Sequence, residues 1–175
     1  ENTDAGLAAI LKGMGSLSYG EVAGERMRLG VMLNDPEEEH SCFADNTHND
    51  HYYDGLGVQN IYRGEYIRVD GTLVSGPSLS DLVTKTDPAL DAEMQAKLST
   101  TMMSLGRIKT AAEAGFAYDQ MLERGNDAGE ALVMGGVNGL IDQTRSIERV
   151  VTALGLDQIA FEGSDSLDDP NAVFQ

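Results

Sequence analysis

The chain has 175 residues, of which 41% are hydrophobic, so it is long enough to build one helical domain around a core. Twelve Lys and Arg against 29 Asp and Glu leave a net charge of −17, which repels phosphate backbones and anionic membrane surfaces. This balance excludes nucleic acid as an expected partner, while an acidic surface by itself identifies no ligand.

The first predicted element is a long or kinked helix over residues 4–34. Asp35 and Pro36 then supply an N-cap and a first-turn proline, and three glutamates follow where the positive end of a helix favours carboxylates. A second helix is therefore predicted over residues 36–62, with an irregular middle. The apolar residues that recur at helical spacing in the first helix are Leu7, Ile10, Leu11, Met14, Leu17, Val22, Leu29, Met32 and Leu33.

The middle of the chain predicts a connection followed by two capped helices. Glycines among β-branched residues favour a loop or one small hairpin near residues 63–74, around Asp70-Gly71. Ser78 can cap a short helix, and Asp87 precedes a proline at the start of a longer helix that ends between residues 110 and 115.

The last predicted helix covers residues 127–154 and carries a long apolar stripe. Four substantial helices with short connections predict an all-α fold, an antiparallel four-helix bundle with at most one small hairpin. The eight methionines and the apolar stripes are interpreted as its core. Residues 1–160 are predicted to form this domain, and residues 161–175 a loosely held C-terminal tail.

Cysteine content and apolar runs exclude further classes. Cys42 is the only cysteine, which excludes an intrachain disulfide and a multi-thiolate zinc site within this chain. No apolar run reaches the roughly 18 residues of a membrane-spanning helix, so this segment is not expected to be transmembrane. The first four residues lack the features of a signal peptide, so an exported protein would be present here in processed form or as a fragment.

Residues that carry chemistry concentrate in the second predicted helix. All three histidines, His40, His48 and His51, lie within twelve residues, beside six carboxylates from Glu37 to Asp54. Residues three and four apart share one face of a helix, so a continuous helix would bring His40 and His51 together beside a polar stripe. That stripe consists of Glu37, Ser41, Asp45, His48 and Tyr52.

A metal site is one explanation of this stripe. Glu37 and His40 form a Glu-x-x-His pair, the arrangement of carboxylate-bridged iron sites in helical bundles, so iron is a candidate cofactor and zinc its alternative. Such a site needs carboxylates from other helices, for which Glu25 is a candidate, while Arg26 can hold a carboxylate or an anionic substrate. The predicted metal ligands are Glu37 and His40, and the predicted ligand or cleft residues are Glu25, Arg26, Ser41, Asp45 and His48.

Two other interpretations of the same residues stay open. Glutamates matched to the helix dipole, together with exposed histidines, explain the spacing without a metal. Ser41 or Cys42 near a histidine, with Asp45 as the orienting group, has the outline of nucleophilic catalysis. A local helix contact and a buried apolar pair explain these last residues more simply.

The sequence around these residues resembles the imelysin-like family. The similarity rests on Gly13-Met14-Gly15-Ser16-Leu17, on Gly24-Glu25-Arg26-Met27 and, above all, on the stretch DPEEEHSCFADNTH from Asp35 to His48. It continues through Gly57-Val58-Gln59-Asn60-Ile61-Tyr62 and Gly76-Pro77-Ser78-Leu79-Ser80-Asp81-Leu82, and thus covers most of residues 10–82.

That resemblance implies a secreted, periplasmic or outer-membrane-anchored protein of the bacterial cell envelope, with a signal peptide that is not in this chain. It also implies two helical halves with a cleft between them. The family's Gly-x-His-x-x-Glu motif, which belongs to the first half of full-length members, is absent, and His51-Tyr52-Tyr53-Asp54 is its nearest approach. The chain therefore resembles the second half of a longer protein, and the N-terminal half is an expected partner.

The resemblance implies either insulin-cleaving metallopeptidase activity or iron-regulated uptake. A metallopeptidase needs a metal-bound water and a general base, usually on a His-Glu-x-x-His helix, and the sequence contains no equivalent. We therefore expect a protein of iron uptake or handling that binds a metal ion or an iron-containing ligand in the cleft. A metallopeptidase is the alternative, and a structural helical module without its own ligand is the third reading.

Overall fold

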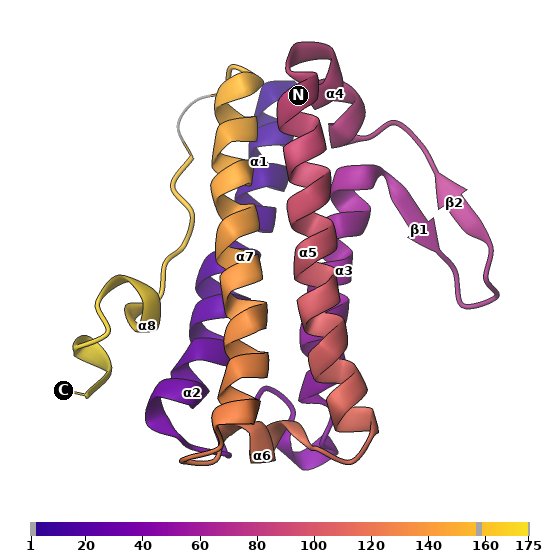
Figure 1. Ribbon diagram of the computed structural model, residues 1–175. Helices are drawn as coiled ribbons and strands as arrows, with labels where there is room; N and C mark the ends of the chain where they lie inside the picture. Colours follow the sequence, from indigo (N-terminus) through magenta and orange to yellow (C-terminus); the bar gives the residue numbers. More distant parts are fainter. Residues whose placement is uncertain (1–2, 157–158, 175) are drawn as a thin grey trace.

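A computed structural model of the chain describes residues 3–156 and 159–174 and contains an antiparallel bundle of four long helical segments (Figure 1). The first segment is continuous over α1 (Thr3–Ser16), the π-helix η1 (Leu17–Arg28) and α2 (Leu29–Leu33). The other three are α3 (Thr47–Arg63), α5 (Pro88–Glu113) and α7 (Asp127–Ala153). The predicted all-α four-helix fold is confirmed.

Capping groups determine where several of these helices begin. The Asp87 carboxylate accepts hydrogen bonds from the first free amides of α5, directly before a first-turn proline. The Asn126 side chain caps α7 in the same way. The short helix α4 (Leu79–Thr86) starts with the predicted capping box, in which Ser78 and Asp81 satisfy each other's amides.

The second bundle helix begins at Thr47 instead of at Pro36, so the predicted start of this helix is wrong. Asn34 ends the first segment in the left-handed conformation, with φ 51°, and Asp45 adopts the same conformation with φ 47°. The Asp35 carboxylate accepts a hydrogen bond (3.0 Å) from the amide two residues later, which closes a turn in place of a helix cap. From Thr47 onward the predicted helix is confirmed.

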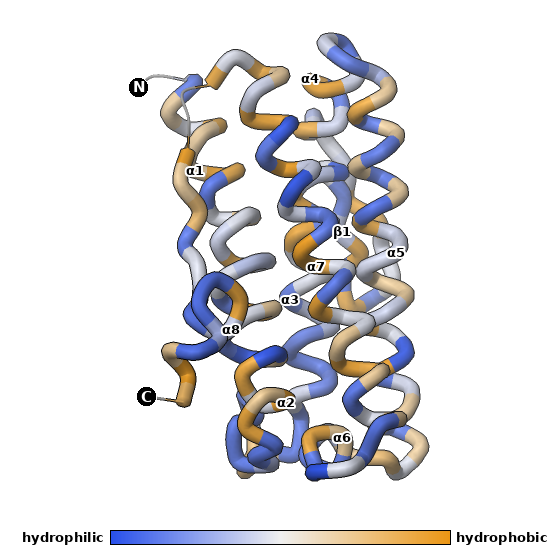
Figure 2. Tube along the Cα trace, turned by 60° about the vertical axis from the view of Figure 1, so that its left-hand side comes forward, coloured by the Kyte–Doolittle hydropathy of each residue, from blue (hydrophilic) through white to orange (hydrophobic). Residues whose placement is uncertain are grey.

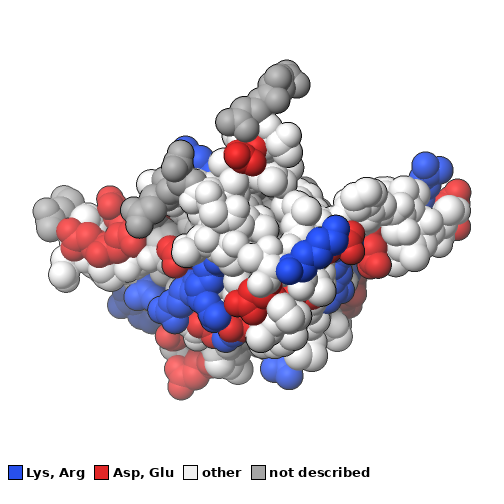
Figure 3. All heavy atoms as spheres, turned by 90° about the horizontal axis from the view of Figure 1, so that it is seen from above, with Lys and Arg blue, Asp and Glu red and all other residues white. Residues whose placement is uncertain are grey.

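One hairpin projects from the bundle between α3 and α4 (Figure 1). β1 (Glu65–Ile67) pairs antiparallel with β2 (Leu73–Ser75), with Tyr66 opposite Val74. The small hairpin predicted near residues 63–74 is thereby confirmed. Both strands are exposed, and seen from above the hairpin extends sideways from the bundle (Figure 3).

The core lies between the four segments in two layers, and apolar residues recur along each long helix (Figure 2). Methionines were predicted to be part of this core, and Met14, Met27, Met94 and Met121 are indeed buried in it. The upper layer includes Leu11, Met14, Val58, Met94, Leu98 and Ile147, and the lower layer includes Val22, Met27, Leu105, Ile108, Val137 and Leu140. The buried residues of the upper layer come from all four segments, whereas α3 contacts the lower layer through the half-buried Tyr52.

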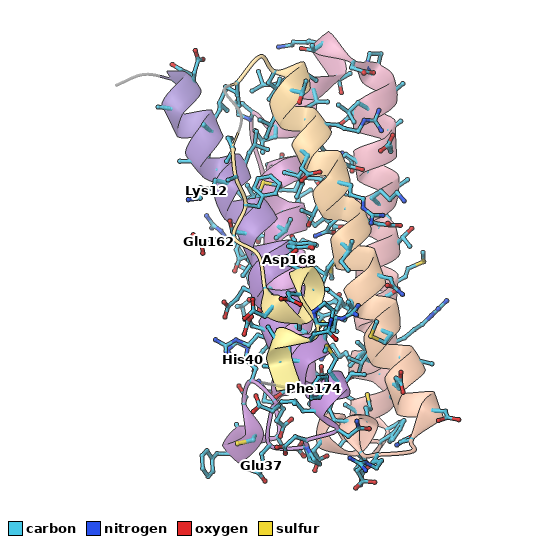
Figure 4. All side chains as sticks on the ribbon, turned by 90° about the vertical axis from the view of Figure 1, so that its left-hand side faces the viewer. Lys12, Glu37, His40, Glu162, Asp168 and Phe174 are labelled. Atoms are coloured by element: carbon cyan, nitrogen blue, oxygen red, sulfur yellow. The ribbon has the colours of Figure 1, made fainter. Side chains whose placement is uncertain are left out.

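The C-terminal segment, predicted to be a loose tail, packs in its described part along the first helical segment (Figure 4). It includes α8 (Asp165–Asp168) and the 3₁₀ turn η3 (Ala172–Phe174). Ser166 donates a hydrogen bond to the Gly24 carbonyl (3.0 Å), and Tyr19 donates one to Asp168 (2.7 Å). Glycine at position 24 permits this approach, since an added Cβ would lie 2.6 Å from the hydroxyl of Ser164. The domain boundary at residue 160 stays a prediction.

Candidate metal centre

Three potential metal ligands meet where η1 faces the lower half of α3. His40, His51 and Asp54 each offer one ligand atom, and these atoms lie within 4.8 Å of one another. His51 and Asp54 are three residues apart on α3 and therefore share a face of that helix. His40 comes from the loop over residues 34–46, whose left-handed residues turn the chain back toward the bundle.

His51 is the buried member of this cluster. Its side chain is 0% exposed, and neither imidazole nitrogen has a hydrogen-bond partner among the described residues. Its ring lies 6.2 Å from the ring of His40 and packs edge-on against Tyr118, at 5.1 Å between centroids. Burial, with a further contribution from His40, lowers the pKa of His51 to about 3. The ring is therefore neutral at physiological pH and keeps an unshared electron pair for a metal.

Asp54 connects the cluster to η1. Burial raises the pKa of this half-buried carboxyl, and the charge of His40 opposes that rise. Glu21 and Arg26 also influence the pKa of Asp54, so they belong to the same polar region. Arg26 is engaged with Glu21, since its Nε and Nη2 both lie 2.7 Å from one Glu21 oxygen. η1 thus contributes an ion pair, between Glu21 and Arg26, beside the potential ligands.

A second buried polar group lies behind His51. Tyr118 belongs to the short helix α6 (Tyr118–Leu122), and neither its hydroxyl nor one carboxylate oxygen of Glu39 has a described hydrogen-bond partner. Burial raises the pKa of Tyr118, and the nearby Glu39 charge adds to the rise. Burial also raises the pKa of Glu39, while a hydrogen bond from Thr47 opposes it. The Tyr118 hydroxyl and the Glu39 carboxyl are thus polar groups on the side of His51 that faces α6.

The π-helix η1 is the least common element at this site. Single π turns inside α-helices recur at functional sites, where they redirect side chains relative to the regular helix. Here the π-helix covers twelve residues and carries Glu21, Glu25 and Arg26. Two of these three side chains, Glu21 and Arg26, form the ion pair beside Asp54, and Glu25 is exposed.

The structure separates the two predicted metal ligands. Glu37 is exposed on the loop and lies outside the cluster that contains His40 (Figure 4). The expected pairing of these residues required a helix from Pro36, and that stretch is a loop. His40 therefore meets His51 across the loop instead of Glu37 along a helix.

The predicted cleft residues have different surroundings. Ser41 donates a hydrogen bond to Asp50, and Asp45 is exposed in its left-handed turn. His48 lies 3.1 Å from the Asn49 side-chain amide through Nε2, while its Nδ1 is buried without a described partner. Of the predicted cleft residues, Arg26 and His48 both help to lower the pKa of His51, and Arg26 also affects the pKa of Asp54.

His51 and Asp54 were not among the predicted ligands. The available signal was the gathering of all three histidines within twelve residues, together with the His-x-x-Asp spacing at positions 51 and 54. That signal has the right residue types but does not say which of them the loop brings to the helix. The fold supplies this information by burying His51 and returning His40 to it.

Comparison with known proteins gives one result. The family model for imelysin matches residues 1–147, which is most of the chain and includes the whole cluster. A search of curated proteins found no match. In the part of the chain that the structure describes, no helix is long and apolar enough to cross a membrane.

Proposed function

Because this chain belongs to the imelysin family, we propose that it is the metal-binding helical module of a cell-envelope protein in bacterial iron handling. His40, His51 and Asp54 would hold the metal. Iron is the proposed ion and zinc its alternative. The N-terminal half of the same protein is the proposed partner, and the periplasm or the outer-membrane surface is the proposed location.

The buried, unpartnered imidazole of His51 carries this proposal. A buried polar group without a hydrogen bond costs about 1–3 kcal/mol, so native proteins retain few of them without a functional reason. A metal ion accepts the free electron pair of a neutral imidazole and so removes the cost for one of the two ring nitrogens. The ligand atoms of His40, His51 and Asp54 lie within 4.8 Å of one another, so small side-chain rotations would bring them onto one ion.

The donor set supports iron and does not exclude zinc. Two imidazoles and one carboxylate are the ligands of non-haem ferrous sites with open positions, and a similar set serves zinc. When bound, either ion supplies a Lewis acid with room for a further ligand. The chain's net charge of −17 also raises the local concentration of cations at its surface.

The surroundings of the cluster favour binding over peptide hydrolysis. A hydrolytic site needs a free carboxylate as general base beside the metal-bound water. Glu21 is the neighbouring carboxylate on η1, and the Arg26 guanidinium occupies one of its oxygens at 2.7 Å. The guanidinium thus occupies an oxygen that a general base would use, so the arrangement supports a binding site.

Anaerobic titration of the purified protein with ferrous ion, and a parallel titration with zinc, tests the proposal. His51→Ala and His40→Ala should each weaken binding by at least about tenfold, since loss of one imidazole leaves the ion under-coordinated. His48→Ala is the matched control, because His48 lies on the same helix outside the cluster. Equal losses in all three variants, or no effect of His51→Ala, would refute the proposed site.

A further inference from the structure

An apolar groove runs along the bundle directly above the ligand cluster. α1 and α3 line it over a volume of about 500 Å³. Ile10 and Ile61 are 44% and 52% exposed on its rim, so the bundle does not cover them. Other residues that line the groove are Gly13, Met14, Leu17, Gly57 and Val58.

The groove and the cluster share one residue. Asp54 lines the lower end of the groove and is also a member of the ligand cluster. On α3, the face that carries Ile61 and Val58 continues one turn further to Asp54 and then to His51. Asp54 is therefore the residue through which a ligand in the groove would contact the proposed metal site.

The first helical segment also changes from apolar to polar residues beside Asp54. Its groove face is apolar through Leu17, and Glu21 follows four residues later. The Glu21 charge affects the pKa of Asp54, which places these two carboxylates in one polar region. Both helical segments that line the groove thus change from apolar to polar residues near Asp54. The groove and the ligand cluster together form a site with an apolar end and a polar end.

Two glycines keep the groove open. A Cβ added at Gly13 or at Gly57 would meet no atom within 4 Å, so the space beside both backbones is free. Asp54 is the only charged residue among those that line the groove. On a protein with a net charge of −17, an apolar groove whose charge is confined to the end at the metal ligands favours an apolar ligand.

We infer that the site takes its metal as a chelate whose organic part is apolar, with the metal at His40, His51 and Asp54 and the organic part in the groove. The inference rests on the proposed metal site and adds the chemical class of its ligand. Burial of the organic part against the two helices would add affinity that a hydrated ion lacks, because apolar surface leaves water.

Two chelators with the same donor atoms test this inference. The quinoline chelator oxine and the amino acid glycine both bind ferrous ion through one nitrogen and one oxygen, and oxine alone carries a fused aromatic ring. The oxine complex should bind the purified protein at least about tenfold more tightly than the glycine complex, which corresponds to about 1.4 kcal/mol. Ferrous ion alone is titrated beside them.

Filling the groove should remove this preference. Gly13→Leu and Gly57→Leu place a side chain in the free space and should bring the two chelates to equal affinity while ferrous ion alone binds as before. Gly135→Leu is the matched control, because Gly135 also has free space beside it and lies on α7, outside the groove. All three changes replace a helical glycine, so they alter helix propensity equally.

The outcomes separate the inference from the proposed function. Equal affinity of the two chelates for the unaltered protein, or a preference that survives Gly13→Leu, overturns the inference and leaves the metal site standing. Ferrous binding that does not change in His51→Ala overturns the metal site itself. Leucine variants that change self-association in sedimentation, with the chelate preference intact, assign the groove to a protein partner and also overturn the inference.

Discussion

Replacing His51 by leucine is expected to stabilise the metal-free protein. Both imidazole nitrogens are buried without a described partner, and an unpaired buried polar group costs about 1–3 kcal/mol. Leucine has a comparable volume and no polar atom, and the main contact that it loses is the edge-on one with Tyr118, worth about 1 kcal/mol. The free energy of unfolding should therefore rise by up to about 2 kcal/mol in His51→Leu.

Urea unfolding with EDTA at about pH 8, followed by circular dichroism, measures this change. At that pH the imidazole is neutral in both the folded and the unfolded state, so its protonation does not contribute. With a urea dependence of about 2 kcal/mol per molar, the midpoint should rise by up to roughly 1 M. Addition of ferrous or zinc ion should reverse the order, because only the unaltered protein gains the free energy of metal binding.

Tyr118→Phe is the matched control for this experiment. It removes a buried hydroxyl group that, like the His51 nitrogens, has no hydrogen-bond partner among the described residues, and it keeps the aromatic ring against His51. Its stability should rise by about 1 kcal/mol, and its metal affinity should stay unchanged. If His51→Leu is less stable than the unaltered protein in EDTA while Tyr118→Phe behaves as expected, the imidazole stabilises the fold and the reasoning from its unpaired nitrogens is refuted.

Three other properties can be measured by the same methods. Burial lowers the pKa of His51 in the folded state to about 3, so between about pH 6.5 and pH 3 the unfolded state binds one more proton than the folded state. The contribution of His51 to the free energy of unfolding is therefore complete above about pH 6.5 and falls by up to about 1.4 kcal/mol per pH unit below it. This free energy should fall less steeply with decreasing pH in His51→Leu. Gly24→Ala should displace the C-terminal segment, because its Cβ would lie 2.6 Å from the Ser164 hydroxyl; faster amide hydrogen exchange near Ser164 is expected, with no change in Gly13→Ala. Asp87→Ala removes the N-cap of α5 and should lower the free energy of unfolding by about 1 kcal/mol, whereas a loss of only a few tenths would mean that the first-turn proline suffices.

Local sequence signals were sufficient for most of the fold. Apolar residues at helical spacing, the caps at Ser78 and Asp87, and the turn residues Asp70-Gly71 act over a few positions, and the corresponding helices and hairpin are present. The same signals failed after Asp35. A carboxylate before a proline and three glutamates is a favourable helix start, but the same carboxylate can also close a turn, and here it does.

For the candidate site, too, local sequence predicted some features and tertiary packing decided the others. The sequence by itself determined that histidines and carboxylates gather within one short stretch and that His51 and Asp54 share a helix face. The sequence also predicted that His40 lies near His51, but along one continuous helix. Only the tertiary structure decided that His40 reaches His51 from a loop and that Glu37 stays outside, because that depends on two left-handed residues, Asn34 and Asp45, in the loop. Burial of His51 and the opening between α1 and α3 likewise depend on how distant helices pack, which no spacing of a few residues encodes.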